Sequence, residues 1–223
     1  MHKTVQNLIN IQNLIKSKQS VLKNNKIIPK IIAVSKTFKL DHILPLIEHG
    51  HVDYGENKVQ EAIEKWSEIK SNNNKIKLHL IGKLQTNKVK ISIKLFDYIH
   101  SLDNEKLARK ISDEQKKQNR KPKLFIQVNI GNESQKNGIH IKKLGEFYNY
   151  CKEQNLNVIG IMCIPPIDDD PELSFLRMNY LKKKFNFKEL SMGMSSDYLI
   201  AVNFNATFLR IGSKIFGQRK SKL

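Results

Sequence analysis

Short apolar runs and amphipathic stretches alternate along the 223 residues of this chain. The apolar runs are rich in isoleucine, valine and leucine, which is typical of fully buried strands. The stretches between them repeat their apolar residues at helical spacing, and the links between the two kinds of segment are short. An alternation of this kind predicts successive parallel β-α units.

Eight of the apolar runs are expected to be strands, at residues 31–36, 51–57, 78–82, 98–103, 123–130, 158–164, 189–194 and 207–212. Helices are expected at residues 1–23, 41–49, 58–69, 86–95, 105–119, 141–154 and 171–185, with a short one after Ser195. Eight strands, each followed by a helix, are what a closed (β/α)8 TIM barrel requires. We therefore predict an α/β fold, a single barrel domain over residues 1–223 with one extra N-terminal helix.

A doubly wound open sheet is the alternative fold for such an alternation. No glycine-rich G-x-G-x-x-G turn supports the dinucleotide-binding version of that sheet.

Single residues in the sequence also indicate where two helices begin or end. Gly50 is a suitable C-cap, while Asp170 is a suitable N-cap with Pro171 at the first helical position.

The charge balance is strongly basic, with 39 Lys and Arg against 21 Asp and Glu and a net charge of +18. Such a surface attracts polyanions, so a nucleic-acid-binding protein is one function class to weigh. The lysines, however, are scattered through every segment, without the clustering and interleaved aromatics of a nucleic-acid site. The abundance of Lys, Asn and Ile is typical of AT-rich coding, and we expect no specific nucleic-acid partner.

The sequence contains no apolar run of transmembrane length and no signal-peptide segment, so we expect no membrane association. Its two cysteines, Cys151 and Cys163, provide neither a disulfide framework nor a metal-ligand spacing. We interpret both as small buried hydrophobes in a reducing compartment, and we expect no metal. These observations predict a cytoplasmic protein.

A lysine, Lys36, ends the first expected strand. The carboxyl ends of barrel strands are where such folds place their active sites. Burial disfavours the ammonium form of a lysine, lowers its pKa and makes the amine nucleophilic, which suits a Schiff base with an aldehyde. Taken alone, a strand-end lysine that extends into solvent is the simpler interpretation.

Small residues follow the last two expected strands, Ser195 after one and Gly212 and Ser213 after the other. Turns of this kind that lead into helices form anion sites from backbone N–H groups and hydroxyls. A phosphate there, with Lys36 across the same mouth, describes pyridoxal 5′-phosphate (PLP). Each signal is weak alone, because Gly-Ser turns are usually only turns, but at these strand positions they support one another.

Seven motifs occur in order along the chain: AVSKT (33–37), GENKVQE (55–61), HLIG (79–82), LQTNK (84–88), GIMCIP (160–165), LSMGMSSD (190–197) and RIGSKIFGQR (210–219). Together they resemble the pyridoxal-phosphate homeostasis proteins, also called the YggS or PROSC family. The resemblance extends over about residues 27–219, nearly the whole chain.

The resemblance implies the alanine-racemase-type PLP barrel as a single domain, with Lys36 holding PLP as a Schiff base and no catalytic residue assigned. It also implies the remaining contacts of the cofactor. The phosphate would bind to Ser195, Gly212 and Ser213, the pyridine nitrogen would face Arg210, Asn57 would lie near the Schiff base, and His79 and Met192 would line the pocket.

The chain departs from the family pattern at two places. Lys83 stands where the family usually has a proline after Gly82, which we interpret as a tolerated loop change. Residues 205–207 read Asn-Ala-Thr where Gly-Ser-Thr is usual. That change lies in the turn before the last strand, and its effect on phosphate affinity is left open.

Arg210 bears on the choice between an enzyme and a carrier. A guanidinium is effectively always protonated, so beside the pyridine nitrogen it keeps that nitrogen unprotonated and makes the ring a poorer electron sink. Alanine racemases of this barrel type add a β-rich second domain and a second acid/base residue, for which we expect no room here. An open mouth also excludes water poorly.

The leading interpretation is therefore a PLP-binding protein of intracellular vitamin B6 homeostasis without robust turnover. Its partners would be PLP and PLP-dependent apoenzymes, and a monomer is expected. The alternative is a PLP-dependent amino-acid racemase that uses an unidentified base.

Overall fold

The strands of the computed structural model form a closed ring. The structure describes residues 1–22, 27–133, 135–167 and 169–218. Its strands are β1 (Lys30–Val34), β2 (Asp53–Glu56), β3 (Lys77–Leu80), β4 (Tyr98–Leu102), β5 (Lys123–Asn129), β6 (Ile139–His140), β7 (Val158–Met162), β8 (Glu189–Met194) and β9 (Phe208–Ile211). Eight of them pair in parallel in the order β4-β3-β2-β1-β9-β8-β7-β5, and pairing of β4 with β5 closes the barrel. The predicted TIM barrel is confirmed, and the open-sheet alternative is wrong.

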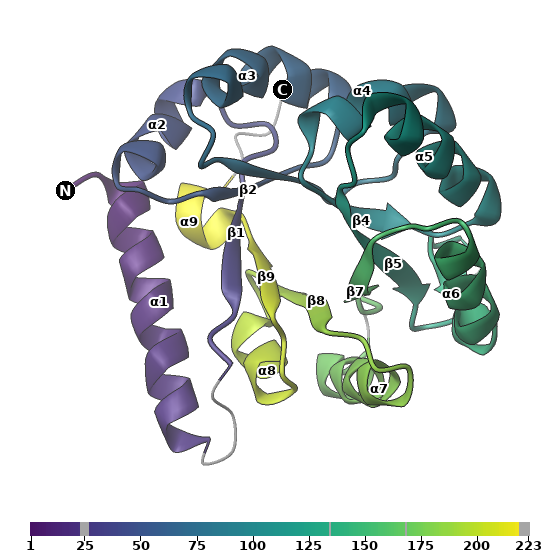
Figure 1. Cartoon of the computed structure of the whole chain (residues 1–223). Coiled ribbons are helices and arrows are strands. Elements are labelled where there is room, and N and C mark those ends of the chain that lie inside the picture. The colour runs from purple at the N-terminus through teal and green to yellow at the C-terminus, as the bar shows by residue number, and fades with distance from the viewer. Residues whose placement is uncertain (23–26, 134, 168, 219–223) are drawn as a thin grey trace.

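The helices surround the barrel, as Figure 1 shows. They are α1 (Lys3–Val21), α2 (Leu40–Glu48), α3 (Val59–Asn72), α4 (Val89–Leu95), α5 (Glu105–Gln118), α6 (Leu144–Glu153), α7 (Pro171–Lys184), α8 (Tyr198–Asn203) and α9 (Ser213–Phe216), with 3-10 turns η1 (Thr86–Lys88) and η2 (Ile141–Lys143) before α4 and α6. The expected helices are confirmed to within a few residues. Residue 23, the expected end of the first helix, and residues 219–223 of the expected domain lie outside the described residues.

Two short elements are absent from the sequence-based expectation. Strand β6 has two residues and pairs with the end of β5, and helix α9 has four residues. Neither is long enough to show a hydrophobic period, so only the folded chain reveals them.

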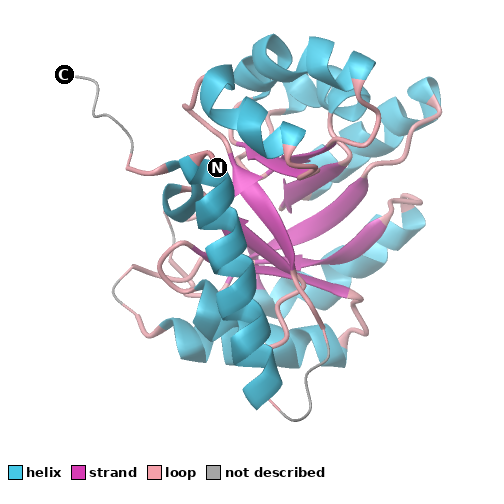
Figure 2. Ribbon diagram, turned by 90° about the vertical axis from the view of Figure 1, so that its left-hand side faces the viewer, coloured by secondary structure: helices cyan, strands magenta, loops and turns pink. Residues whose placement is uncertain are grey.

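Helix α1 lies outside the ring and packs against α2, α8 and α9. Figure 2 shows it standing across one side of the barrel. Its buried face carries Leu8, Ile11 and Ile15, three and four residues apart. Within the described ranges, no helix is long and apolar enough to cross a membrane.

The core has two layers because each inner strand buries both of its faces. The outer layer packs strand residues such as Ile31, Ala33 and Leu209 against the helices. The barrel interior holds a smaller apolar cluster that comprises Ile32, Tyr98, Phe125, Met162 and Phe208. Cys151 and Cys163 are both free and buried, as predicted.

The helix boundaries read from single residues are also confirmed. The Asp170 carboxylate accepts a hydrogen bond from the backbone N–H of Glu172 at 2.9 Å, with Pro171 as the first helical residue. Gly50 follows the last turn of α2 at a φ of 91°, a left-handed conformation that favours glycine.

Candidate functional site

A cavity of about 670 Å³ opens at the carboxyl ends of the barrel strands. Its described lining comprises Val34, Lys36, Asn57, Ile81, Gly82, Lys83, Gln127, Asn137, Ile164, Met194, Ser195, Ser196, Arg210, Gly212, Ser213 and Gln218. Six of the eight site residues predicted from the sequence are in this set, namely Lys36, Asn57, Ser195, Arg210, Gly212 and Ser213. The fold therefore brings together residues that are up to 177 positions apart in the chain, from Lys36 to Ser213.

The backbone on both sides of Lys36 is fixed by two carboxylates, the buried Glu56 and the partly exposed Glu61. Ser35 is fully buried, and its hydroxyl donates to Glu56 Oε1 at 2.7 Å. The carbonyl oxygen of Ser35 accepts from Lys65 Nζ at 2.9 Å. On the other side, the backbone N–H of Thr37 donates to Glu61 Oε1 at 2.5 Å. These contacts hold the strand end so that the position of Lys36 at the cavity is determined by β2 and α3.

A serine hydroxyl joins the two turns that follow β8 and β9. Ser195 Oγ accepts from the backbone N–H of Gly212 at 3.2 Å and from that of Lys214 at 3.4 Å. The turn after β8 is itself closed by Asp197, whose Oδ1 accepts from the N–H of Met194 at 2.6 Å. Hydroxyl and N–H donors of both turns thus converge on one end of the cavity, an arrangement that suits an anion.

Gly193 is required for this turn. Its φ is 88°, and an added Cβ would lie 2.7 Å from the Cβ of Ala201. A side chain would therefore be strained by the backbone and blocked by α8.

Arg210 forms part of the cavity wall and is only 4% exposed. Its Nη1 donates to Ser191 Oγ at 2.8 Å, and its Nη2 donates to the carbonyl oxygen of Cys163 at 2.8 Å. These two bonds use two of the five N–H donors of the guanidinium. Burial lowers the pKa of Arg210, but the guanidinium begins so far above neutrality that it stays charged.

Asn57 and Gly82 form the rim between β2 and β3. An added Cβ on Gly82 would lie 2.2 Å from the carbonyl oxygen of Asn57. Only a glycine allows this approach, which places Asn57, Ile81 and Lys83 on the same cavity wall.

The two remaining predicted residues, His79 and Met192, do not line the described cavity. His79 lies on β3, two residues before Ile81, and is fully buried in the barrel interior, where it bonds to Asp53 and His100. Met192 is fully buried and points outward into the layer beneath the helices. The position at the cavity is taken by Met194, because the register of β8 shifts between Ser191 and Met194.

Several lining residues are absent from the set of site residues predicted from the sequence. Gln127 and Asn137 lie on the side of β5, where Gln127 Nε2 donates to the carbonyl oxygen of Asn137 at 3.2 Å. Alternation along β5 places Gln127 on the inward face with Phe125, so a strict period of two would have indicated it. Lys83 was noted as a departure from the family pattern, and it lies at this cavity.

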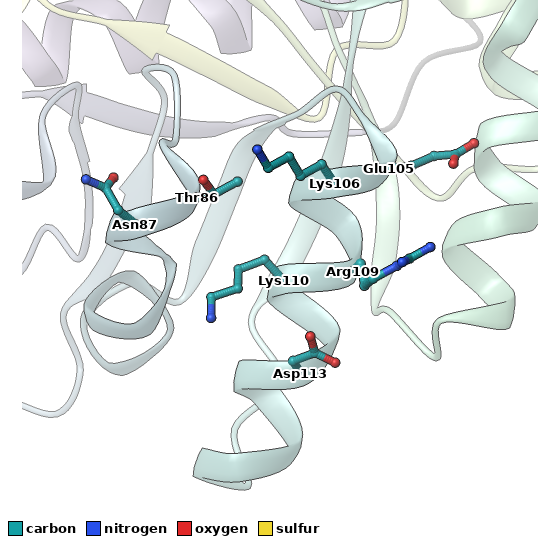
Figure 3. A pocket seen from close by; sticks show the side chains of 7 residues that line it. All are labelled: Thr86, Asn87, Glu105, Lys106, Arg109, Lys110 and Asp113. Atoms are coloured by element: carbon teal, nitrogen blue, oxygen red, sulfur yellow. The ribbon is translucent and has the colours of Figure 1, made fainter.

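A second cavity, of about 550 Å³, lies between η1 and the first turns of α5. Figure 3 shows Lys106 and Lys110 pointing toward Thr86 and Asn87, whereas Glu105 and Arg109 point the other way. Arg109 donates to the Tyr150 hydroxyl of α6 at 3.4 Å. The lining mixes both charges and, within the described residues, carries no aromatic side chain, so it lacks the features of a nucleic-acid groove.

No group of three or more His, Cys, Asp or Glu side chains in the described residues is arranged to hold a metal ion.

A closed parallel barrel of this kind is also the fold of alanine racemase. The sequence family described as alanine racemase, N-terminal domain, matches residues 7–220 of this chain. The alanine racemase of Clostridium difficile 630 has the same fold, with a TM-score of 0.74 at 15% identity, over 99% of this chain and 58% of the racemase. That level of identity shows the fold alone.

Two further relatives are more similar in sequence. The pyridoxal phosphate homeostasis protein of Aquifex aeolicus (strain VF5) is 38% identical over 202 residues, 86% of this chain and 87% of the relative. The structure of PipY from Synechococcus elongatus with PLP bound is 31% identical, with a TM-score of 0.77, and covers 92% of this chain and 100% of PipY. The chain belongs to the family of pyridoxal phosphate homeostasis proteins, as the resemblance of its motifs predicted.

Proposed function

We propose that this chain binds PLP as a Schiff base on Lys36 and acts in PLP homeostasis without robust catalytic turnover. The observation that carries the proposal is the single cavity that contains Lys36, Arg210 and the turn of Ser195, Gly212 and Ser213. An amine, a guanidinium and an anion-binding turn match the aldehyde, the ring nitrogen and the phosphate of one ligand.

The residues present fit the cofactor at each of these points. Gly212 adds no side chain to the turn after β9, so its backbone is uncovered at the cavity. Ser195 holds this turn against the turn after β8. When bound, PLP supplies an electron sink, and its strength depends on the group that faces the ring nitrogen. PipY, which has the same fold, has been observed with PLP bound.

The chemistry of the cavity wall favours a carrier over an enzyme. Among the described lining residues there is no carboxylate, imidazole, phenol or thiol that would serve as a second acid or base. Lys83 is the remaining amine besides Lys36, and its side chain is exposed at the rim. The cationic Arg210 in the wall weakens carbanion chemistry by keeping the ring nitrogen unprotonated.

PLP-dependent apoenzymes are the partners that fit this role, because a Schiff base on an accessible lysine is reversible and releases the cofactor intact. We place the protein in the cytoplasm, as its two free buried cysteines suit a reducing compartment. We also propose that it acts as a monomer.

Borohydride reduction followed by peptide mapping tests the assignment. The protein is incubated with PLP, reduced and digested, and the phosphopyridoxyl adduct is located by mass spectrometry. We expect one adduct, on the peptide that contains Lys36. The adduct should be absent from Lys36→Ala and retained in Lys39→Ala, a matched change at an exposed lysine three positions along the chain.

An adduct on Lys83, adducts scattered over surface lysines, or a reducible adduct that survives in Lys36→Ala would each contradict the assignment. Incubation of the loaded protein with L- or D-alanine tests the second part of the proposal. Sustained turnover of either enantiomer would show that the chain is an amino-acid racemase instead.

A further inference from the structure

An unbroken row of hydrogen-bonded side chains crosses the barrel interior from the cavity to the opposite end. Arg210 Nη1 contacts Ser191 Oγ at 2.8 Å, and Ser191 Oγ contacts His100 Nδ1 at 2.9 Å. His100 Nε2 lies 3.0 Å from His79 Nδ1, and His79 Nε2 lies 2.9 Å from Asp53 Oδ1. We call these five residues the interior row. Its three middle members are each 2% exposed or less, namely Ser191, His100 and His79.

Donor and acceptor chemistry gives the interior row one direction. The carboxylate of Asp53 only accepts, so His79 carries its proton on Nε2 and presents a bare Nδ1. His100 must then donate from Nε2, which leaves its Nδ1 to accept from the Ser191 hydroxyl. Ser191 in turn accepts from Arg210, which only donates. Every hydrogen bond therefore points from Arg210 toward Asp53, with both imidazoles in the same neutral tautomer.

The surroundings of the two imidazoles keep them neutral and fixed. Burial lowers the pKa of His79 and of His100 below that of a free histidine. The His79 ring stacks on Tyr98 with centroids 4.2 Å apart, and the His100 ring stacks on Phe125 at the same distance. The rings cannot turn without displacing these aromatic neighbours, so the order of donors is maintained.

We propose that Ser191, His100 and His79 are positioning residues for Arg210, and that they hold its guanidinium in the orientation that meets the ring nitrogen of PLP. This inference rests on the proposed function and names a device that supports it. The row acts through Arg210 alone, because neither His79, His100 nor Ser191 lines the described cavity.

The geometry at Arg210 explains why Ser191 is needed. The planar guanidinium is held at two corners, by Ser191 on one side and by the carbonyl oxygen of Cys163 on the other. Two fixed corners define the plane of the group, whereas one would leave it free to rotate. Loss of Ser191 removes one corner and also leaves His100 Nδ1 without its donor.

The inference can also be tested at Asp53, the end of the interior row that lies farthest from Arg210. Asp53 lies at the amino end of the barrel, where it lines a separate cavity of about 310 Å³ with Lys30 and His51. His51 Nε2 lies 2.9 Å from the carbonyl oxygen of Asp53, so the carboxylate remains available to His79. In an Asp53→Asn variant the amide can donate as well as accept, so the row loses its obligatory direction.

The first experiment needs no cofactor. Long-range ¹H–¹⁵N spectra of the ligand-free protein at pH 7 report the tautomer of each histidine ring. We expect His79 and His100 as neutral rings with the proton on Nε2. A proton on Nδ1 of either ring, or a protonated ring, would overturn the row.

The second experiment compares Ser191→Ala with Ser101→Ala. Ser101 is also buried in the barrel wall, but its hydroxyl has no partner among the described residues, so its removal breaks no hydrogen bond. We expect the dissociation constant for PLP to rise roughly tenfold in Ser191→Ala, the effect of one lost hydrogen bond to a charged group. We also expect the visible absorption band of the bound cofactor to change its wavelength or pH dependence, and the Ser101→Ala protein to match the wild type in both.

Asp53→Asn is the second test, which applies if Ser191→Ala does not fold. Asp53 lies at the amino end of the barrel, and three residues of the interior row separate it from Arg210. A changed cofactor spectrum in this variant supports the inference, and an unchanged spectrum and affinity in every folded variant overturns it. Failure of the proposed function has a different outcome: the wild-type protein itself would form no adduct at Lys36.

Discussion

The carbonyl oxygen of Asn57 lies 2.2 Å from the position that a Cβ on Gly82 would occupy. Backbone atoms cannot move aside as a flexible side chain does, so the rim between β2 and β3 exists only with glycine at position 82. Gly82→Ala is therefore expected to lower the free energy of unfolding by about 2–4 kcal/mol, as overpacking and backbone displacement do. Chemical denaturation of the ligand-free protein measures this loss.

Gly212→Ala is the matched substitution with the opposite expectation. An added Cβ there would meet Val34 no closer than 3.4 Å, which is ordinary contact. The variant should unfold within about 0.5–1 kcal/mol of the wild type while it binds PLP more weakly, because the methyl group narrows the phosphate end. Equal stability loss in both glycine variants would contradict this view of the rim.

Glu56 is a buried carboxylate that holds β1, β2 and α3 together behind Lys36. Its Oε1 accepts from Ser35 Oγ, Lys65 Nζ and Trp66 Nε1 at 2.7, 2.9 and 3.0 Å. Glu56→Gln keeps the volume but removes the charge opposite Lys65, so we expect a stability loss of about 2–4 kcal/mol. Denaturation measures the loss, and Glu64→Gln on the exposed face of α3 is the control, with an expected change below about 0.5 kcal/mol. A loss as small as that of the control would show that the network is not needed.

The eight strands of the barrel could be predicted from the sequence because each one carries its own signal, unlike the two-residue β6. Buried strands such as β1, with Ile31, Ile32, Ala33 and Val34, need no distant information to be recognised. The position of Lys36 at the end of such a strand then places it at the cavity by the general rule for barrels. The local sequence was therefore sufficient to place a residue at the cavity when that residue directly follows a recognisable strand.

The sequence was insufficient where the role depends on which face of a strand a residue occupies. His79, His100 and Ser191 are single polar residues within apolar runs, and nothing local indicates that their side chains meet in the barrel interior. A similar cause explains why Met194 lines the cavity, whereas the predicted residue was Met192. A register shift in β8 interrupts the alternation from which the inward face would be read.

The two cysteine thiols should be unreactive in the folded protein. Burial raises the pKa of Cys151 and of Cys163 to about 12, so neither forms an appreciable thiolate near neutral pH. Iodoacetamide at pH 8 is expected to leave both unmodified in the native state and to label both once the chain is unfolded in denaturant. Rapid labelling of native Cys163 would show that the core packing around its thiol opens to solvent.

The buried histidines make stability depend on pH in a predictable direction. Burial lowers the folded-state pKa of His51, His79 and His100, whereas the same rings in the unfolded chain titrate near 6.5. Below that pH the unfolded chain takes up protons that the folded chain does not, so stability is present above about pH 6.5 and is lost as the pH falls. Each such ring contributes a slope of about 1.4 kcal/mol per pH unit. Burial raises the pKa of Asp53, but the hydrogen bond from His79 and the nearby positive charges together outweigh burial and lower it. The stability that Asp53 contributes is therefore lost in a separate window, as the pH falls below its ordinary pKa of 3.8.

Denaturant titrations at pH 7, 6 and 5 test this dependence in His100→Gln against His49→Gln, a change at an exposed ring that follows α2. His100→Gln should be less stable than the wild type at pH 7, because it disturbs the interior row, and should lose less further stability on going to pH 5. The His49→Gln protein should keep the wild-type slope. Repulsion among the many positive charges of the chain acts on all three proteins alike, so the difference in slope isolates the buried ring. An identical slope in the His100→Gln protein would mean that His100 is protonated in the folded state, which would also break the single direction of the interior row.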